Sequence, residues 1–87
     1  MEVFYTSRFA REAKRVPRNL RGAVEERVEI FRRDSFDPRL KTHKLTGALK
    51  GFWSFYIDYR YRVIFEFIKA DRVLFHSIGD HSIYDEF

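Results

Sequence analysis

Apolar residues recur at helical spacing in the N-terminal third of the chain. One stripe consists of Leu20, Ala23, Val24, Val28 and Phe31. A shorter stripe precedes it and consists of Phe9, Ala10, Ala13 and Val16. Residues three and four positions apart share one helix face, so each stripe indicates an amphipathic helix. Pro17 separates the two stripes, and proline is tolerated in a first helical turn but not in a helix interior. The pattern therefore predicts helices over residues 7–15 and 17–33.

Strand patterns occupy both ends of the chain. Residues 2–6 read as a short strand, and three longer candidates cover residues 52–57, 61–68 and 72–78. The short connections 58–60 and 69–71 suit antiparallel hairpins. Turn-forming residues fill 34–38, and residues 41–51 are expected to be a loop or a short strand. The sequence thus predicts one α+β domain over residues 1–87: an N-terminal strand, a two-helix hairpin, and an antiparallel β-meander that carries the helices on one face.

Alternation along the predicted strands assigns side chains to faces. In strand 61–68 one face carries Tyr61, Val63, Phe65 and Phe67. This all-apolar set is the natural core face, so Arg62 is expected on the open face of the sheet. In the last strand His76 shares a face with Leu74 and Ile78, and we expect a packed, partly buried structural histidine. Trp53 is likewise expected in the core, with a stacking platform for a base as the alternative.

Charge is distributed unevenly along the chain, whose net charge is +4. Between residues 39 and 62 one acid, Asp58, accompanies the basic residues Arg39, Lys41, Lys44, Lys50, Arg60 and Arg62. Such a concentration favours a polyanionic partner. In the helical region the arginines are interspersed with glutamates. Three of them, Arg27, Arg32 and Arg33, lie off the apolar stripe and are expected on a solvated helix face, with a direct nucleic-acid role as the alternative.

Several classes of protein are excluded by what the sequence lacks. There is no cysteine, which rules out disulfides and thiolate metal sites and is compatible with a reducing compartment. No basic segment followed by an apolar run opens the chain, and no stretch approaches a membrane span. Glycine-rich phosphate loops and HExxH are missing, and the carboxylates are scattered. We therefore expect a cytoplasmic protein with neither cofactor nor metal.

The residues that remain suit metal-free RNA cleavage. They are His43, Lys44, Lys50, Arg62, His81 and Tyr84. Cleavage by the ribose 2′-hydroxyl needs a base, a proton donor for the leaving 5′-oxygen, and cations for the charge that grows on the phosphate. Histidine exchanges protons near neutral pH, and arginine binds two phosphate oxygens at once. From the residues alone, plain binding of a polyanion remains the alternative.

Four segments carry a resemblance to a known family. They are His43-Lys44-Leu45-Thr46-Gly47, Leu49-Lys50-Gly51-Phe52-Trp53-Ser54, Tyr61-Arg62-Val63-Ile64-Phe65, and Ile78-Gly79-Asp80-His81 with Tyr84. In this order, behind a strand and a helical hairpin, they resemble the RelE/ParE superfamily of toxins from type II toxin–antitoxin modules. The similarity covers nearly the whole chain. It is strongest to the mRNA-cleaving branches, which include RelE-, YoeB- and YafQ-like members.

The resemblance implies a role for each candidate residue. Arg62 matches the strand arginine that contacts the scissile phosphate; the alternative is a surface salt bridge to an acid nearby. His43 takes the position where YoeB-like members carry a carboxylate base and YafQ-like members a histidine; the alternative is a plain loop histidine. His81 resembles the C-terminal catalytic histidine of both groups, the expected general acid; the alternative is a turn residue capped by Asp80. Tyr84 would orient a base or donate a proton, or simply pack on the sheet. Basic residues expected to neutralise RNA phosphates are Lys41, Lys44, Lys50 and Arg60.

The sequence also departs from these relatives. The best-known RelE members use a lysine- and arginine-rich site without the histidine pair. YafQ-like members carry a further histidine and an aspartate on the central strands, where this chain has Tyr56 and Arg60. The division of acid and base roles between His43 and His81 therefore stays open.

As a whole, the resemblance implies an endoribonuclease that cuts mRNA at the ribosome without a metal and leaves a 2′,3′-cyclic phosphate or 3′-phosphate. Its expected partners are mRNA on the ribosome and a cognate antitoxin, typically an acidic or partly disordered segment. Neither a membrane nor a small-molecule cofactor is expected. Two alternatives remain: a ParE-like toxin that poisons DNA gyrase, and a degenerate member that only binds RNA or its antitoxin.

Overall fold

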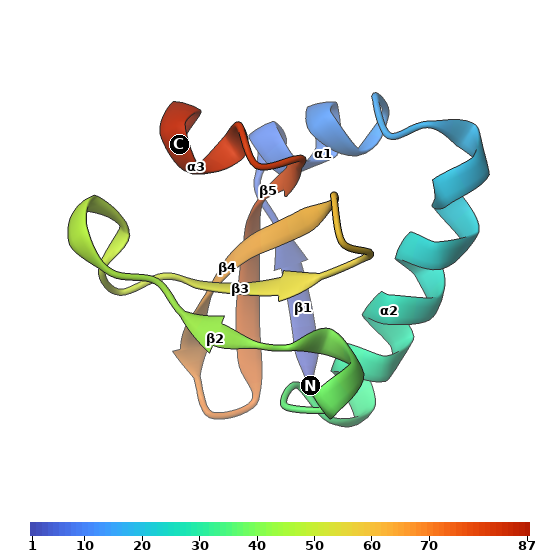
Figure 1. The fold of residues 1–87 in the computed structure, drawn as a ribbon. Coiled ribbons are helices and arrows are strands. Elements are labelled where there is room, and N and C mark those ends of the chain that lie inside the picture. Colours follow the sequence, from blue (N-terminus) through green and yellow to red (C-terminus); the bar gives the residue numbers. More distant parts are fainter.

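A computed structural model describes all residues, 1–87, as one five-stranded sheet with helices packed against it (Figure 1). The strands are β1 (Glu2–Tyr5), β2 (His43–Lys44), β3 (Trp53–Tyr56), β4 (Arg62–Lys69) and β5 (Arg72–Gly79). The helices are α1 (Ser7–Ala13), α2 (Arg21–Arg33) and α3 (Ile83–Glu86), with 3-10 turns at Arg18–Leu20, Pro38–Leu40 and Gly47–Leu49. The α+β class and the order of strand, two helices and three long strands are as predicted.

The sheet has the strand order β1-β5-β4-β3-β2, and its ladders from β5 to β2 are antiparallel. β1 instead lies parallel to β5, with Glu2 beside Arg72 and Tyr5 beside Phe75. The predicted antiparallel meander is confirmed in β3, β4 and β5, whereas the parallel pairing of β1 was not predicted. Thr6 fixes the exit of β1, because its amide donates to the Phe75 carbonyl at 3.1 Å and its hydroxyl to the His76 carbonyl at 3.1 Å.

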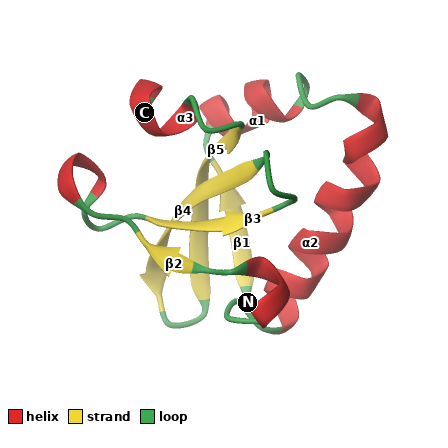
Figure 2. Cartoon of the chain, viewed as in Figure 1, coloured by secondary structure: helices red, strands yellow, loops and turns green.

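Both predicted helices are present, with corrected boundaries. α1 starts where the Thr6 hydroxyl accepts the Phe9 amide at 3.0 Å, an N-cap of the usual kind, and it ends at Ala13 rather than at residue 15. The second helix does not begin at Pro17. Pro17 precedes a single 3-10 turn, and α2 starts at Arg21. Figure 2 shows the bend that this turn introduces between the two helices.

The core lies between the helices and one face of the sheet. Phe31 of α2 is fully buried, and its ring centroid lies 4.9 Å from those of Phe55 and Phe65 and 5.3 Å from that of Phe75. Truncating such a residue to alanine costs about 3–5 kcal/mol. Val63 and Phe65 are buried as predicted. Tyr61, Phe67 and Trp53 are partly buried against the same cluster, also as predicted.

A β-bulge in β5 corrects one expectation and confirms another. Ile64 pairs with Ser77 and Phe65 with Phe75, so His76 has no residue opposite it. Beyond the bulge Ile78 joins the core cluster, and its predicted place beside His76 was wrong. His76 is nevertheless the partly buried structural histidine that we expected. Its Nε2 lies 2.7 Å from Glu66 Oε1, and its ring meets Phe52 edge-on at 5.1 Å.

The last helix, α3, has no counterpart in the predicted elements. Its Ile83 packs directly on Gly79, where an added Cβ would lie 2.5 Å from the isoleucine Cγ2. Beyond the helix, the ring of Phe87 packs edge-on against Phe52 at 4.9 Å and lies under the Arg8 guanidinium. α3 is thus held on the sheet at both ends. None of the helices combines the length and the hydropathy that a membrane span requires.

Candidate functional site

Strand register gathers four of the site's side chains on the sheet face that is turned away from the core. His43 of β2 pairs with Ser54 of β3, and two residues on along β3, Tyr56 pairs with Arg62 of β4. Directly paired residues share a face, and so do residues two apart on one strand. His43, Ser54, Tyr56 and Arg62 therefore lie on one side, as alternation predicted for Arg62.

Arg62 lies on the expected face but is only 7% exposed, so the expectation of an open position was wrong. Its Cζ lies 3.8 Å from the Tyr56 ring centroid, a cation–π contact. Its Nη2 donates to the Tyr59 carbonyl at 2.8 Å, and its Nε is buried without a partner. The turn and the neighbouring strand bury a charge that no carboxylate neutralises.

The alternative role for Arg62, a salt bridge, is not found. No carboxylate lies within 4.0 Å of its guanidinium. Glu66 pairs with His76, and Asp58 accepts the amides of Arg60 and Tyr61 at 2.8 and 2.6 Å. A buried and unpaired guanidinium is costly unless an anion compensates it, so Arg62 is a candidate anion ligand.

His43 is exposed, and its tautomer follows from one contact. Its Nδ1 lies 2.8 Å from the Lys41 carbonyl oxygen. A carbonyl only accepts, so Nδ1 carries the hydrogen, and in the neutral ring Nε2 carries the free lone pair. The ring centroid lies 6.1 Å from that of Tyr56. His43 and Arg62 thus flank the same tyrosine ring.

α3 brings Tyr84 back onto this face. The Tyr84 hydroxyl lies 2.7 Å from Ser54 Oγ, and the His81 ring centroid lies 5.6 Å from the Tyr84 centroid. Asp80 orders the turn before α3, since its Oδ1 accepts from both Oγ and N of Ser82. These two hydrogen bonds lower the pKa of Asp80, and the basic groups of Arg60 and His81 lower it further. The turn before α3 and α3 itself therefore place both His81 and Tyr84 beside the site.

The four predicted phosphate ligands divide into two pairs. Lys41 borders the site, with its Nζ 5.7 Å from the Tyr56 ring centroid, and Arg60 lines a shallow pocket with Asp80 and His81. Lys44 alternates to the other face of β2, where its Nζ lies 5.5 Å from the Trp53 ring centroid.

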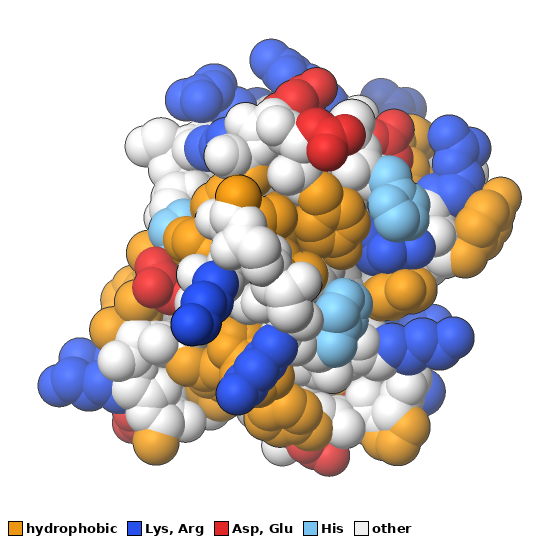
Figure 3. Space-filling view, turned by 60° about the vertical axis from the view of Figure 1, so that its left-hand side comes forward, with side chains coloured by type: hydrophobic (Ala, Val, Ile, Leu, Met, Phe, Trp, Pro, Cys, Tyr) orange, Lys and Arg blue, Asp and Glu red, His pale blue; other side chains and the backbone are white.

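Lys50 is the remaining predicted phosphate ligand, and it lies away from the site. It lines a separate cavity of about 530 Å³ together with Lys44. Figure 3 shows histidine side chains on a face that also carries lysines, arginines and exposed apolar groups.

Two residues at the centre of the site were not predicted to belong to it. Ser54 holds the Tyr84 hydroxyl, and Tyr56 separates Arg62 from His43. Tyr56 could have been found, because pairing of the predicted hairpin strands places it beside Arg62. Ser54 gives no such signal, since its partner comes from α3. No three His, Asp or Glu side chains are gathered in a way that could hold a metal ion.

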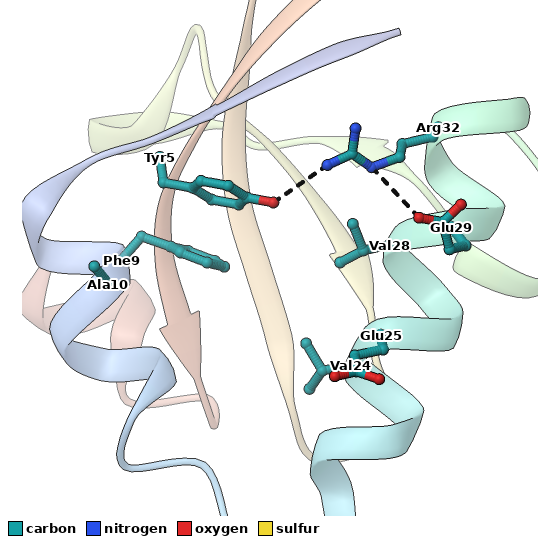
Figure 4. Close-up of a pocket in the computed structure, with 8 residues that line it drawn as sticks. All are labelled: Tyr5, Phe9, Ala10, Val24, Glu25, Val28, Glu29 and Arg32. Carbon is teal, nitrogen blue, oxygen red and sulfur yellow. Dashed lines mark hydrogen bonds and ion pairs between the residues drawn. The ribbon is translucent and has the colours of Figure 1, made fainter.

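A second, apolar groove lies between α1 and α2, away from this face (Figure 4). Its volume is about 540 Å³, and Phe9, Val24 and Val28 point into it. At one end Arg32 reaches the Tyr5 hydroxyl at 3.5 Å.

Comparison with solved structures identifies the fold. YafQ from Escherichia coli BL21(DE3) superposes with a TM-score of 0.79 at 13% identity, over 95% of this chain and 96% of that one. The YoeB/ParE toxin from Agrobacterium tumefaciens gives 0.75 at 18% identity, over 93% and 99%. A RelB–RelE antitoxin–toxin complex from Methanococcus jannaschii gives 0.74 at 22% identity, over 97% and 98%. These proteins are RelE/ParE-superfamily toxins, and the fold is theirs. No protein-family model and no curated protein sequence matches the chain.

Proposed function

We propose that this protein is the toxin of a type II toxin–antitoxin module and that it cleaves mRNA as a metal-independent endoribonuclease. The observation that carries the proposal is Arg62. It is a buried guanidinium without a carboxylate partner, held by Tyr56 beside an exposed histidine, on a fold shared with RelE, YoeB and YafQ. A phosphate would supply the negative charge that Arg62 lacks.

The chemistry follows from the groups present. His43 Nε2 takes the proton of the ribose 2′-hydroxyl, and the 2′-oxygen bonds to phosphorus. The bond from phosphorus to the 5′-oxygen breaks, and His81 gives its proton to that leaving oxygen. Arg62 holds the phosphate oxygens while their negative charge grows. The products are a 2′,3′-cyclic phosphate and a 5′-hydroxyl.

Tyr84 serves as the positioning residue of this arrangement. Its hydroxyl is held by Ser54, whose side chain is fully buried, so the phenol cannot swing freely. Its ring stands beside His81, which is exposed on the turn that Asp80 orders. Without the contact between the Tyr84 and His81 rings, the His81 imidazole, which is the proton donor, would not be held in one position.

The openness of the site is an argument for ribosome dependence. His43 and His81 are exposed on the sheet face, and none of the cavities encloses both of them. A flexible RNA strand gains little order from such a surface, while in-line attack needs close alignment of the reacting atoms. An mRNA that the ribosome already holds extended would meet this requirement.

An antitoxin is the second proposed partner. Solved neighbours include toxin–antitoxin complexes, DinJ–YafQ from E. coli and RelB–RelE from M. jannaschii. In this chain the groove between α1 and α2 offers the apolar side chains of Phe9, Val24 and Val28 to a segment of such an antitoxin. We expect the antitoxin to silence the toxin when bound.

The proposed function is tested by adding the purified protein to a cell-free translation reaction and mapping the 5′ ends of the mRNA. New, discrete ends inside the translated region support it. The same preparation is incubated with DNA gyrase and supercoiled DNA. Gyrase-dependent DNA breaks with intact mRNA would replace the proposal with a gyrase-poisoning toxin, and neither activity would indicate a protein that only binds.

A further inference from the structure

A small cavity of about 190 Å³ lies between α2 and the turn that joins β3 to β4. Its basic lining residues come from different segments: Arg27 from α2, Arg39 from the turn Pro38–Leu40, and Lys41 directly after it. Asp58 is the acid in this lining, and its Oδ1 already accepts the two turn amides described above. The lining is therefore net positive.

Two of the three cations have no carboxylate partner. Arg39 is engaged, because its Nε and Nη2 lie 3.0 and 2.9 Å from the carboxylate of Asp37, and this pairing lowers the pKa of Asp37 to about 2. Arg27 and Lys41 have no carboxylate within 4.0 Å. Arg27 donates through Nη1 to the Arg39 carbonyl at 3.2 Å, and its Nε is buried without a partner.

The cavity adjoins Arg62 through shared residues. Tyr56 lines the cavity, and its ring contacts both Lys41 Nζ and the Arg62 guanidinium. Tyr59 also lines it, and its carbonyl accepts the Arg62 Nη2 hydrogen bond. Arg27 and Lys41 thus share the cavity with Tyr56, and Arg62 contacts the ring of the same tyrosine.

The backbone of Lys41 supports a specific role for this segment. Lys41 has φ 51°, which makes it the one non-glycine residue in the left-handed region. Residues in this region carry strain that surrounding structure must hold in place. Here the conformation lets the Lys41 carbonyl accept His43 Nδ1–H while its side chain lies over Tyr56.

We propose that Arg27 and Lys41 bind the RNA phosphate that neighbours the scissile one. This inference rests on the proposed function and extends it. Arg62 takes the reacting phosphate, and the cavity takes the next phosphate along the strand. Because Arg27 and Lys41 do not touch the reacting atoms, they act in affinity and not in the chemical step.

The test compares Arg27→Gln and Lys41→Gln with Arg33→Gln, which removes the same charge from an exposed residue near the end of α2 that makes no ion pair. Binding is measured with a short, single-stranded 2′-O-methyl RNA, which cannot be cleaved through a 2′-hydroxyl. We expect each cavity variant to weaken binding roughly tenfold, as the loss of one charge-assisted contact would. The slope of log affinity against log salt should fall by about 0.7 for each lost phosphate contact.

With cleavable mRNA on the ribosome, the single-turnover rate at saturating protein should equal that of the wild type. The proposal is overturned if both cavity variants bind like Arg33→Gln, or if they bind normally and lose the chemical step. If Arg27→Gln does not fold, the binding of Lys41→Gln alone tests the proposal. This variant should fold, since the exposed Lys41 side chain makes no hydrogen bond. The 2′-O-methyl RNA reports binding only. A wild-type protein that cleaves no mRNA would refute the proposed function, and the binding measurement would still test the phosphate site.

Discussion

The guanidinium carbon of Arg62 lies 3.8 Å from the centroid of the Tyr56 ring, and the two residues are paired across β3 and β4. No hydrogen bond involves the Tyr56 hydroxyl, so the contact depends on the ring. Tyr56→Phe should therefore keep kcat/KM within about twofold of the wild type. Tyr56→Leu should lower it about tenfold, because a partly desolvated cation–π contact contributes about 1–2 kcal/mol. Equal effects of the two substitutions would contradict this role of the ring.

We expect Arg62 to support cleavage and to lower the stability of the fold. Its charge is buried without a carboxylate, one protein carbonyl accepts from its Nη2, and its Nε has no partner. Replacing such a group by an apolar side chain of similar length often stabilises the fold. Arg62→Met should raise the free energy of unfolding by about 1 kcal/mol in chemical denaturation and abolish cleavage. A destabilised Arg62→Met variant would mean that Arg62 is structural.

Gly79 has a special role because Ile83 packs directly against it. The methyl group of Gly79→Ala would lie 2.5 Å from Ile83 Cγ2, so α3 must move and carry Tyr84 away from Ser54. We expect loss of most mRNA cleavage while the circular dichroism spectrum stays native. Gly22→Ala is the matched control, since nothing lies within 4 Å of its added Cβ; in a helix it should stabilise by about 0.5–1 kcal/mol. A Gly79→Ala variant that still cleaves mRNA would show that cleavage does not depend on the position of α3.

Ser54 and Tyr84 should behave as one unit in a double-mutant cycle. Their oxygen atoms lie 2.7 Å apart, and Ser54 is fully buried. Ser54→Ala and Tyr84→Phe should each cost about 1 kcal/mol of unfolding free energy, and the double variant should cost little more than either. Additive costs in urea denaturation would show that the hydrogen bond does not form in solution.

The sequence predicted the site where a local pattern determined it. Period-two alternation left one face for Arg62, because Val63 and Phe65 had to be buried. Burial of Arg62 was not predictable from its own strand, since Tyr56 and Tyr59 from the neighbouring strand and turn produce it. Side-chain chemistry made His43, His81 and Tyr84 candidates, and the resemblance supplied their roles.

Other features of the fold leave no local pattern. A lone first strand does not encode its partner, so the parallel ladder between β1 and β5 was missed. One extra residue in β5 shifts every later side chain to the other face, which moved Ile78 into the core. α3 has four residues, too few to show a helical period.

The chemistry of the new RNA ends reports whether the RNA's own 2′-hydroxyl attacks a phosphate that Arg62 holds. Ribosomes that hold a defined mRNA are incubated with wild-type protein or with Arg62→Met, and the upstream fragments are analysed by mass spectrometry. With the wild type we expect discrete fragments ending in a 2′,3′-cyclic phosphate or 3′-phosphate, and with the folded Arg62→Met variant we expect intact mRNA. Fragments ending in a 3′-hydroxyl, or equal cleavage by both proteins, would contradict it.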